Sequence, residues 1–270
     1  MIENGGNPME PDYKNWMPKG MIWSFLAGAV AALALCLVVA CTGLLGAGTL
    51  KTVLAVIFAA LAVVFCALTI WSVMMYRAFD YNGKRKLSKQ IIDGVAARVK
   101  LPEGGRCLDV GCGSGALAIA VAKRNPRASV TGIDRWGKEY ASFSKNLCER
   151  NAKAEGVTNT SFQKGDATHL DFPDATFDAV VSNYVYHNIP GDRQQYLLET
   201  LRTLKPGGAF AIHDIFSKSK YGDMQAFVKR LKEMGYRRVE LIDTTDGMFM
   251  TKGEATWMAL SGSAILAGIK

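Results

Sequence analysis

The chain has 270 residues, 49% of them apolar and 21% charged, and its formal net charge is +8. This length suits one domain with an additional segment and is short for two large domains. The six cysteines form no Cys-x-x-Cys pair, which argues against a disulfide framework and against a zinc site. The positive charge does not indicate nucleic acid, because several basic residues flank an apolar region and no nucleic-acid-binding motif is present.

The first quarter of the chain contains two long apolar segments. No charged residue stands between Lys19 and Lys51, and none stands between Lys51 and Arg77. At about 1.5 Å per residue, helices over residues 21–45 and 52–75 are long enough to cross the roughly 30 Å hydrocarbon core of a bilayer. We therefore predict a transmembrane helical hairpin over residues 21–76, preceded by a tail of residues 1–20.

Two alternatives apply to this region. A cleaved signal peptide has an apolar stretch of roughly 7–15 residues, which is shorter than the first segment, and no second span follows it at once. A hairpin of a soluble protein is expected to have a polar face, and neither segment shows one. Both features favour the transmembrane hairpin.

Basic residues are distributed unevenly around the two segments. Lys84, Arg85, Lys86 and Lys89 follow the second segment, whereas the connection between the segments has only Lys51. Since cytoplasmic flanks have the excess of lysine and arginine, we expect a multi-pass protein of the cell membrane with its N-terminus and its large C-terminal part in the cytoplasm. The basic cluster either contacts anionic head groups or serves only as the topology signal.

From residue 88 onward, strand patterns alternate with helix patterns. Strands are predicted over residues 106–110, 129–133, 160–164, 179–182 and 209–213, and helices over 88–99, 114–124, 138–155, 192–204 and 222–234. Ser88 is expected to cap the first of these helices, and Gly156 to end the third. Two further strands, over 238–243 and 255–265, follow with no helix between them. This order predicts an α/β fold with a mostly parallel sheet that is covered on both faces, and one antiparallel strand near its end.

The stretch Leu108-Asp109-Val110-Gly111-Cys112-Gly113-Ser114-Gly115 joins the first of these strands to a helix. Its three glycines allow a sharp turn and let a ligand lie directly on the backbone at the N-terminus of that helix. The spacing also fits the dinucleotide pattern Gly-x-Gly-x-x-Gly/Ala, with Ala116 in the last position. A nicotinamide cofactor is therefore one candidate ligand.

Three acidic residues distinguish the candidate ligands. Asp109 precedes the first glycine, where a carboxylate attracts an ammonium group and repels a pyrophosphate. Asp134 ends the second strand and is placed to accept two ribose hydroxyls, and Asp166 follows the third strand, where it would accept from an amine of a purine. S-adenosylmethionine combines an amino acid end, a ribose and an adenine, and therefore matches all three positions.

The ordered set of motifs resembles the class I S-adenosylmethionine-dependent methyltransferases over about residues 88–270. Residues 108–115, 131–134, 164–167, 177–183 and 204–208 carry the resemblance. It implies a Rossmann-like seven-stranded sheet whose last strand is antiparallel, with residues 77–100 as a basic linker and first helix and residues 101–270 as the methyltransferase domain. It also implies that S-adenosyl-L-methionine is the cofactor and is held by Asp109, Gly111, Cys112, Gly113, Gly115, Asp134, Arg135, Trp136, Asp166, Ala167 and Asn183.

Candidates for the reacting side chains follow the fourth and fifth strands: Tyr184, Tyr186, His187 and His213. Open α/β sheets bind their ligands at the carboxyl ends of such strands. His187 is the candidate general base, since imidazole is the side chain that most often exchanges protons near neutral pH, and bracing of the loop is the alternative. For His213 the alternative is a hydrogen bond to Asp214, and for the tyrosines it is a place in the pocket wall. The sequence shows no spacing typical of metal ligands.

A soluble acceptor needs no membrane anchor, so the hairpin favours a methyl acceptor that is small and apolar or lipid-like. Two alternatives use the same glycines: an NAD(P)-dependent oxidoreductase, and a non-catalytic membrane protein that binds S-adenosylmethionine. The sequence does not indicate nucleic acid as a partner, and it leaves the acceptor atom and the oligomeric state open.

Overall fold

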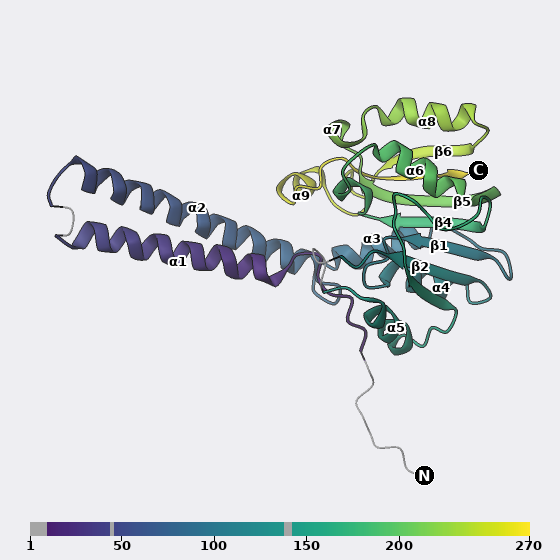
Figure 1. The fold of residues 1–270 in the computed structure, drawn as a ribbon, viewed down its shortest axis with the longest axis horizontal. Helices are drawn as coiled ribbons and strands as arrows, with labels where there is room; N and C mark the ends of the chain where they lie inside the picture. The colour runs from purple at the N-terminus through teal and green to yellow at the C-terminus, as the bar shows by residue number, and fades with distance from the viewer. Residues whose placement is uncertain (1–9, 44–45, 138–141) are drawn as a thin grey trace, which may run out of the picture. The chain divides into compact units, whose positions relative to one another are not determined.

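The computed structural model describes residues 10–43, 46–137 and 142–270 of the chain. Contacts divide the chain into two compact units. Asn15–Ser88 form a helical unit, whereas the residues up to Lys14 group with Lys89–Lys270 in a sheet unit. The chain therefore leaves the sheet unit before the helical unit and returns to it afterwards (Figure 1).

The helical unit is dominated by a hairpin of α1 (Lys19–Cys41) and α2 (Thr49–Phe79). Small residues line the contact between the two helices: a Cβ atom added to Gly28 would lie 3.0 Å from the ring of Phe65. The outer faces expose large apolar side chains, such as Val63, which is 69% exposed. Both helices are long and apolar enough to cross a membrane, by length and composition. The prediction of two long apolar helices is therefore confirmed.

The sheet unit contains a seven-stranded sheet in the order β3-β2-β1-β4-β5-β7-β6. The strands β1 to β5 are parallel to their neighbours within that set, whereas β7 is antiparallel to both β5 and β6. The predicted sheet with an antiparallel last strand is therefore confirmed. The strands are β1 (Arg106–Val110), β2 (Ser129–Asp134), β3 (Thr160–Lys164), β4 (Phe177–Asn183), β5 (Leu204–Ile215), β6 (Arg237–Asp243) and β7 (Ser263–Ile269).

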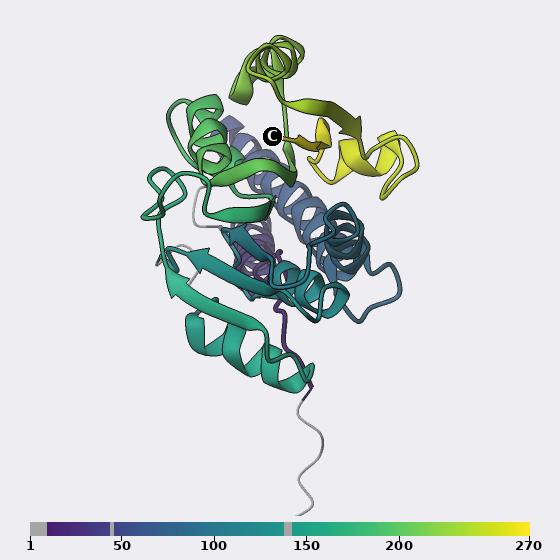
Figure 2. The same ribbon diagram turned by 90° about the vertical axis from the view of Figure 1, so that its right-hand side faces the viewer.

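Helices cover both faces of this sheet (Figures 1 and 2). α4 and α5 connect β1 to β2 and β2 to β3, and α6 connects β4 to β5. Because such crossovers are right-handed and the strand order changes direction between β1 and β4, α4 and α5 lie on one face and α6 lies on the other. The helices are α3 (Leu87–Ala96), α4 (Ala116–Arg124), α5 (Lys145–Ala154), α6 (Arg193–Arg202), α7 (Lys218–Tyr221), α8 (Met224–Glu233) and α9 (Lys252–Trp257), with a short 3-10 helix, η2 (Tyr186–Asn188).

The change of direction places the carboxyl ends of β1 and β4 side by side, with the ends of β2 and β5 next to them. At such a point the connecting loops leave toward opposite faces and open a crevice between them, where open α/β sheets bind ligands. The glycine stretch follows β1, and the candidate reacting side chains follow β4 and β5. The fold thus brings both groups of predicted residues to one edge of the sheet.

Two helix starts differ from the prediction. Ser88 lies inside α3 and not at its cap, and its hydroxyl donates a hydrogen bond to the carbonyl of Phe79. The helix predicted over residues 138–155 begins at Lys145, where the side chain of Ser144 caps it. Residues 138–141 lie outside the described residues. Gly156 follows α5 with a φ of 67°, in the left-handed region that favours glycine, as expected for the end of a helix.

The single strand predicted over residues 255–265 is wrong. A short helix, α9, occupies the first part of this range, and β7 begins only at Ser263. Thr251 and Glu254 form a capping box at the start of α9, in which each side chain accepts from the backbone N–H of the other residue. This pair is a local helix signal, and it outweighs the apolar run that suggested a strand.

Candidate functional site

The glycine loop, residues 111–115, leaves the end of β1 with little side-chain cover. The φ angles of Gly111, Gly113 and Gly115 are 73°, 54° and 82°, in the left-handed region that favours glycine. A Cβ atom at Gly111 would lie 2.2 Å from the side chain of Val185, so this position is closed to larger residues. A Cβ atom at Gly113 would lie 3.7 Å from the ring of Phe143, which is an ordinary van der Waals contact. A single methyl group therefore fits beside the Phe143 ring, whereas a longer side chain would meet it.

Asp134, at the end of β2, is directly connected to the glycine loop. One carboxylate oxygen accepts the backbone N–H of Gly113 at 2.9 Å, and the other accepts the backbone N–H of Trp136 at 2.7 Å. The indole N–H of Trp136 in turn donates to the carbonyl of Gly113 at 3.0 Å. A carboxylate offers about four lone-pair directions, so each oxygen of Asp134 retains the capacity to accept a further donor.

Asp109 lies on β1 next to the glycine loop and is only 1% exposed. Neither of its carboxylate oxygens makes a hydrogen bond of normal geometry within the described residues. Burial raises the pKa of Asp109 to about 8; the backbone N–H of Ala118 offsets part of this increase, and the nearby charge of Asp134 adds to it. A buried carboxyl without a partner is costly, and an ammonium group is the natural partner for its charged form.

The other residues predicted to hold the cofactor differ in how exposed they are. Asp166 is exposed, and hydrogen bonds from the backbone and hydroxyl of Thr168 lower its pKa. Arg135 is exposed, whereas Trp136 and Ala167 are half-buried. Cys112 is 7% exposed, and burial together with the thiol of Cys148 raises its pKa well above the usual range. A low-pKa reactive thiol is therefore absent from this position.

His187 and Asp214 form a close pair across the ends of β4 and β5. Nδ1 of His187 lies 2.5 Å from Oδ1 of Asp214, which is fully buried. The carboxylate also accepts the backbone N–H of Tyr186 at 2.9 Å and that of Ile215 at 2.7 Å. These donors fix the carboxylate, which then requires the proton of His187 on Nδ1 and leaves the lone pair of Nε2 free. The His187 side chain is 13% exposed, so part of it is accessible from outside.

His213 has a different environment from His187. It is fully buried, and its ring nitrogens lie 2.8 Å from Oδ1 of Asn183 and 3.1 Å from the hydroxyl of Thr244. Burial lowers the pKa of His213 to about 3, against the opposing charge of Asp214. The imidazole is therefore neutral near pH 7, and both of its nitrogens are occupied. The hydrogen bond between His213 Nδ1 and Oδ1 of Asn183 also orients the amide group of Asn183.

Both candidate tyrosines are held by hydroxyl groups. The hydroxyl of Tyr184 lies 2.8 Å from that of Ser263, which itself donates to a backbone carbonyl, so Tyr184 is the donor. Tyr186 is fully buried, and its hydroxyl lies 2.5 Å from that of Thr200. Burial raises the pKa of both tyrosines above the usual value. Of the four candidate reacting side chains, His187 thus combines exposure with a free nitrogen.

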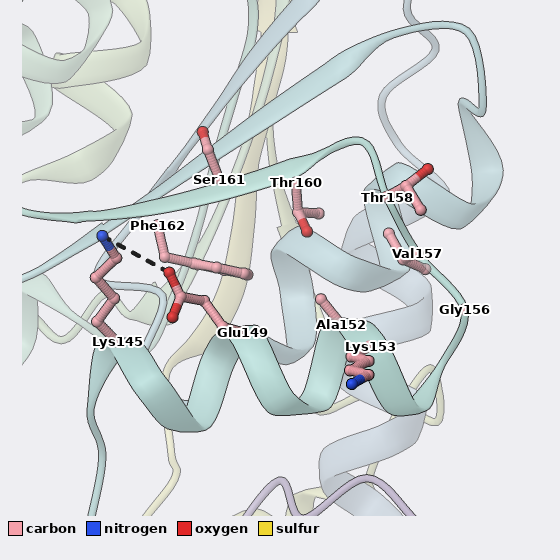
Figure 3. A pocket seen from close by; sticks show the side chains of 10 residues that line it. All are labelled: Lys145, Glu149, Ala152, Lys153, Gly156, Val157, Thr158, Thr160, Ser161 and Phe162. Atoms are coloured by element: carbon pink, nitrogen blue, oxygen red, sulfur yellow. Dashed lines mark ion pairs between the residues drawn. The ribbon is translucent and has the colours of Figure 1, made fainter. Parts of the chain in front are cut away.

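A separate hollow of about 470 Å³ lies between α5 and β3 (Figure 3). It is open to solvent, and its floor includes Phe162. Lys145 at its rim forms an ion pair with Glu149 at 3.6 Å. The loop that enters β3 also lines it, at the opposite end of that strand from the glycine loop. Volume alone therefore does not mark the ligand site, because the carboxylates and glycines lie at the other edge. Among the described residues, no group of three His, Cys, Asp or Glu side chains is arranged to hold a metal ion.

Two residues at this edge have contacts that were not predicted from the sequence. A hydrogen bond between His213 and Asp214 was one alternative, and the structure pairs Asp214 with His187 instead. Thr244, which holds His213, gave no sequence signal, because it lies 31 residues further along the chain and is brought close only by the β6–β7 pairing. Asp214 directly follows His213 on β5, and this position at a strand end was the one available signal.

Comparisons with known proteins agree on the kind of domain. Residues 108–212 match a family model described as "Methyltransferase domain". The 27-O-demethylrifamycin SV methyltransferase of Amycolatopsis mediterranei is 33% identical over 146 residues, which are 54% of this chain and 52% of that protein. The ubiquinone/menaquinone biosynthesis C-methyltransferase of Desulfotalea psychrophila is 32% identical over 171 residues, which are 63% of each chain. The chain thus spans about half to somewhat under two thirds of the length of these relatives.

A solved structure has the same fold. The crystal structure of the [4+2]-cyclase SpnF aligns with a TM-score of 0.54 and 22% identity, over 71% of this chain and 85% of that chain. At this level of identity the likeness shows the architecture of the sheet unit alone.

Proposed function

We propose that this chain, which contains a domain of the S-adenosylmethionine-dependent methyltransferase family, is a membrane-held enzyme that methylates a small, apolar or lipid-like acceptor. The observation that carries the proposal is the pair of carboxylates, Asp109 and Asp134, on the two strands that flank the glycine loop within the family match. This arrangement suits an adenosyl amino acid better than a dinucleotide, because an ammonium group would stabilise the ionised form of the buried Asp109 and a pyrophosphate would not.

The residues present fit S-adenosylmethionine. Asp109 is a buried carboxyl that lacks a partner, and it suits the ammonium group of the methionine part. Asp134 can accept the ribose hydroxyls while it holds the loop through the N–H of Gly113. Asp166, Arg135, Trp136 and Ala167 are the candidates for contacts with the adenine. When bound, this cofactor supplies a methyl group that its sulfonium already activates for transfer.

The contribution of the chain is then to place an acceptor in line with that methyl group and to remove a proton where the acceptor has one. His187 is suited to the second task, since Asp214 holds its Nδ1–H and leaves Nε2 as the proton acceptor. The same carboxylate stabilises the imidazolium that forms. Tyr184 and His213 pack beside it with ring centroids 4.6 Å apart and form the wall that supports the loop.

The hairpin restricts the acceptor. Its outer faces expose apolar side chains, which require a lipid or protein cover. By the positive-inside rule, the basic residues that follow the second helix support an orientation with both ends of the hairpin in the cytoplasm. The names of the two relatives mention 27-O-demethylrifamycin SV and the biosynthesis of ubiquinone and menaquinone, and quinones of this kind agree with an acceptor of low polarity. One of these names specifies an oxygen acceptor and the other a carbon acceptor, so the names do not decide the acceptor atom.

Transfer of a tritiated methyl group tests the proposal. Membranes from cells that lack the gene are incubated with purified protein in nanodiscs and methyl-labelled S-adenosylmethionine, and the lipid extract is counted. We expect label in the extract with the native chain and none with Gly113→Arg, because the φ of 54° at this position favours glycine and a long side chain would meet the ring of Phe143. Binding of the cofactor without label would instead indicate a non-catalytic binding protein, and binding of NADH would indicate an oxidoreductase.

Asp134→Ala is expected to weaken the affinity for S-adenosylhomocysteine at least about tenfold, because a charged acceptor of two hydroxyls is lost. The variant also removes the anchor of the Gly113 N–H. Calorimetric titration measures the change, and Asp171→Ala, a carboxylate exposed on the surface after β3, is the matched control. Unchanged affinity in Asp134→Ala would refute the assignment of the ribose.

A further inference from the structure

Asn151, on α5, links the glycine loop to the N-terminal segment. It is 1% exposed, and its amide group donates to the carbonyl of Ser114 at 2.9 Å and to the carbonyl of Asp12 at 3.0 Å. Its oxygen accepts the backbone N–H of Asp12 at 2.7 Å. Both amide hydrogens and the oxygen are therefore in use, and one side chain holds two segments that lie more than a hundred residues apart in the sequence.

The N-terminal segment has a second attachment to the same helix. Tyr13 is 5% exposed, and its hydroxyl donates to Glu155 at 3.0 Å. Glu155 also pairs with Lys123 at the end of α4, at 2.6 Å. Although partial burial opposes it, the two donors lower the pKa of Glu155. Residues 12–14, which we call the strap, thus lie against α5 and are fixed at two points.

The strap directly precedes the helical unit in the chain. It belongs to the sheet unit, and the next residue, Asn15, begins the helical unit. The carbonyl of Ser114 lies between Gly113 and Gly115, the part of the loop that is expected to bear the cofactor. Since the strap contacts Asn151 and Asn151 contacts this carbonyl, any displacement of the strap changes the hold on the loop.

We propose that Asn151 is a positioning residue through which the strap sets the affinity of the glycine loop for the cofactor. The inference rests on the proposed function, because it assumes that the loop binds an adenosyl amino acid. Loss of the Asn151 amide leaves the carbonyl of the buried Ser114 without this donor, and a looser conformation of the loop is the expected consequence. The strap thereby makes the segment that leads into the hairpin a part of the cofactor site.

The test compares Asn151→Asp, Tyr13→Ala and the native protein as full chains in nanodiscs. Asn151→Asp keeps the shape and an acceptor but cannot donate to the carbonyls of Ser114 and Asp12. Tyr13→Ala loosens the strap without replacing any residue of the loop. We expect S-adenosylhomocysteine to bind about tenfold more weakly to each variant, on the scale of a lost buried hydrogen bond. We also expect the amides of Gly113 and Gly115 to exchange hydrogen about tenfold faster in the ligand-free variants.

Asn125→Ala is the matched control, because Asn125 is also buried and bonds to two backbone groups, those of Leu101 and Val121, away from the loop. Its affinity and loop exchange should be native even where its melting temperature falls. The proposed role of the strap would be wrong if Asn125→Ala lost affinity and loop protection to the same extent, or if Tyr13→Ala kept native affinity and native loop exchange. If the native chain binds no S-adenosylhomocysteine, the proposed function fails, and hydrogen exchange in the ligand-free chains still decides the role of the strap.

Discussion

His187→Ala is expected to lower kcat by a factor of about 10²–10⁴, the usual contribution of a general base, while the affinity for the cofactor stays native. The reason is geometric: Asp214 fixes the Nδ1–H of His187, so that Nε2 is the one basic atom of this pair that faces away from the buried carboxylate. The measurement is methyl transfer at saturating concentrations of both substrates, with cofactor affinity followed separately by calorimetry.

Two variants separate catalysis from bracing. His187→Gln keeps a polar side chain of similar reach that can still bond to Asp214, so a structural brace would be largely restored while a base would not. His169→Ala removes an exposed histidine after β3 and serves as the control for a general loss of imidazole. If His187→Gln turns over at the native rate, His187 braces the loop and is no base.

The arrangement of the strands could be predicted because each signal is local. A buried strand followed by a turn is indicated by an apolar run that ends in Asp109 and the glycine loop, and by one that ends in Asp134. This signal does not depend on residues that are distant in the sequence. The same is true of the two long apolar helices. By contrast, α9 was missed because its six residues give no helical period, and the capping box of Thr251 and Glu254 was the single local sign of it.

The site could be predicted as a set of residues but not as a set of contacts. Parallel strands bring their carboxyl ends together, so His187 and Asp214 were expected at one edge. Which of the two histidines pairs with Asp214 depends on the turn after β4, where Tyr184 has a φ of 54°, and no pattern in the sequence specifies this. Asn151 was out of reach for the same reason, because both of its partners are distant in the chain.

The burial of Asp109 also corrects a simple expectation about charge. From the sequence, this residue is a carboxylate beside the glycines. In the folded chain its pKa is raised to about 8, so near pH 7 and without a ligand it is mostly a neutral acid. The site therefore stores a proton where the ammonium group of the cofactor is expected. Binding then has to ionise the acid, and this requirement is measurable.

Binding of S-adenosylhomocysteine to the native chain is expected to release close to one proton at pH 7 and little at pH 9. The ammonium group stabilises the ionised form of Asp109, which in the ligand-free chain is reached only above a pH of about 8. Calorimetric titrations in two buffers with different ionisation enthalpies count the protons released. Asp109→Asn should abolish the release and weaken binding about a hundredfold, because the buried partner of a charge is removed.

The ligand-free chain provides an independent check of the same group. A carboxyl whose pKa is raised in the folded state keeps its proton there after the unfolded chain has lost it. The contribution of Asp109 to stability is therefore greatest at acid pH, declines as the pH rises from about 4 to about 8, and is constant above that range. Asp109→Asn should remove this decline from the pH dependence of the melting temperature. Among the described groups at this edge, Asp109 is the carboxyl that combines a raised pKa with the lack of a hydrogen-bond partner. Proton release at the native level in Asp109→Asn, or no release from the native chain at pH 7, would therefore show that the amine of the cofactor binds elsewhere.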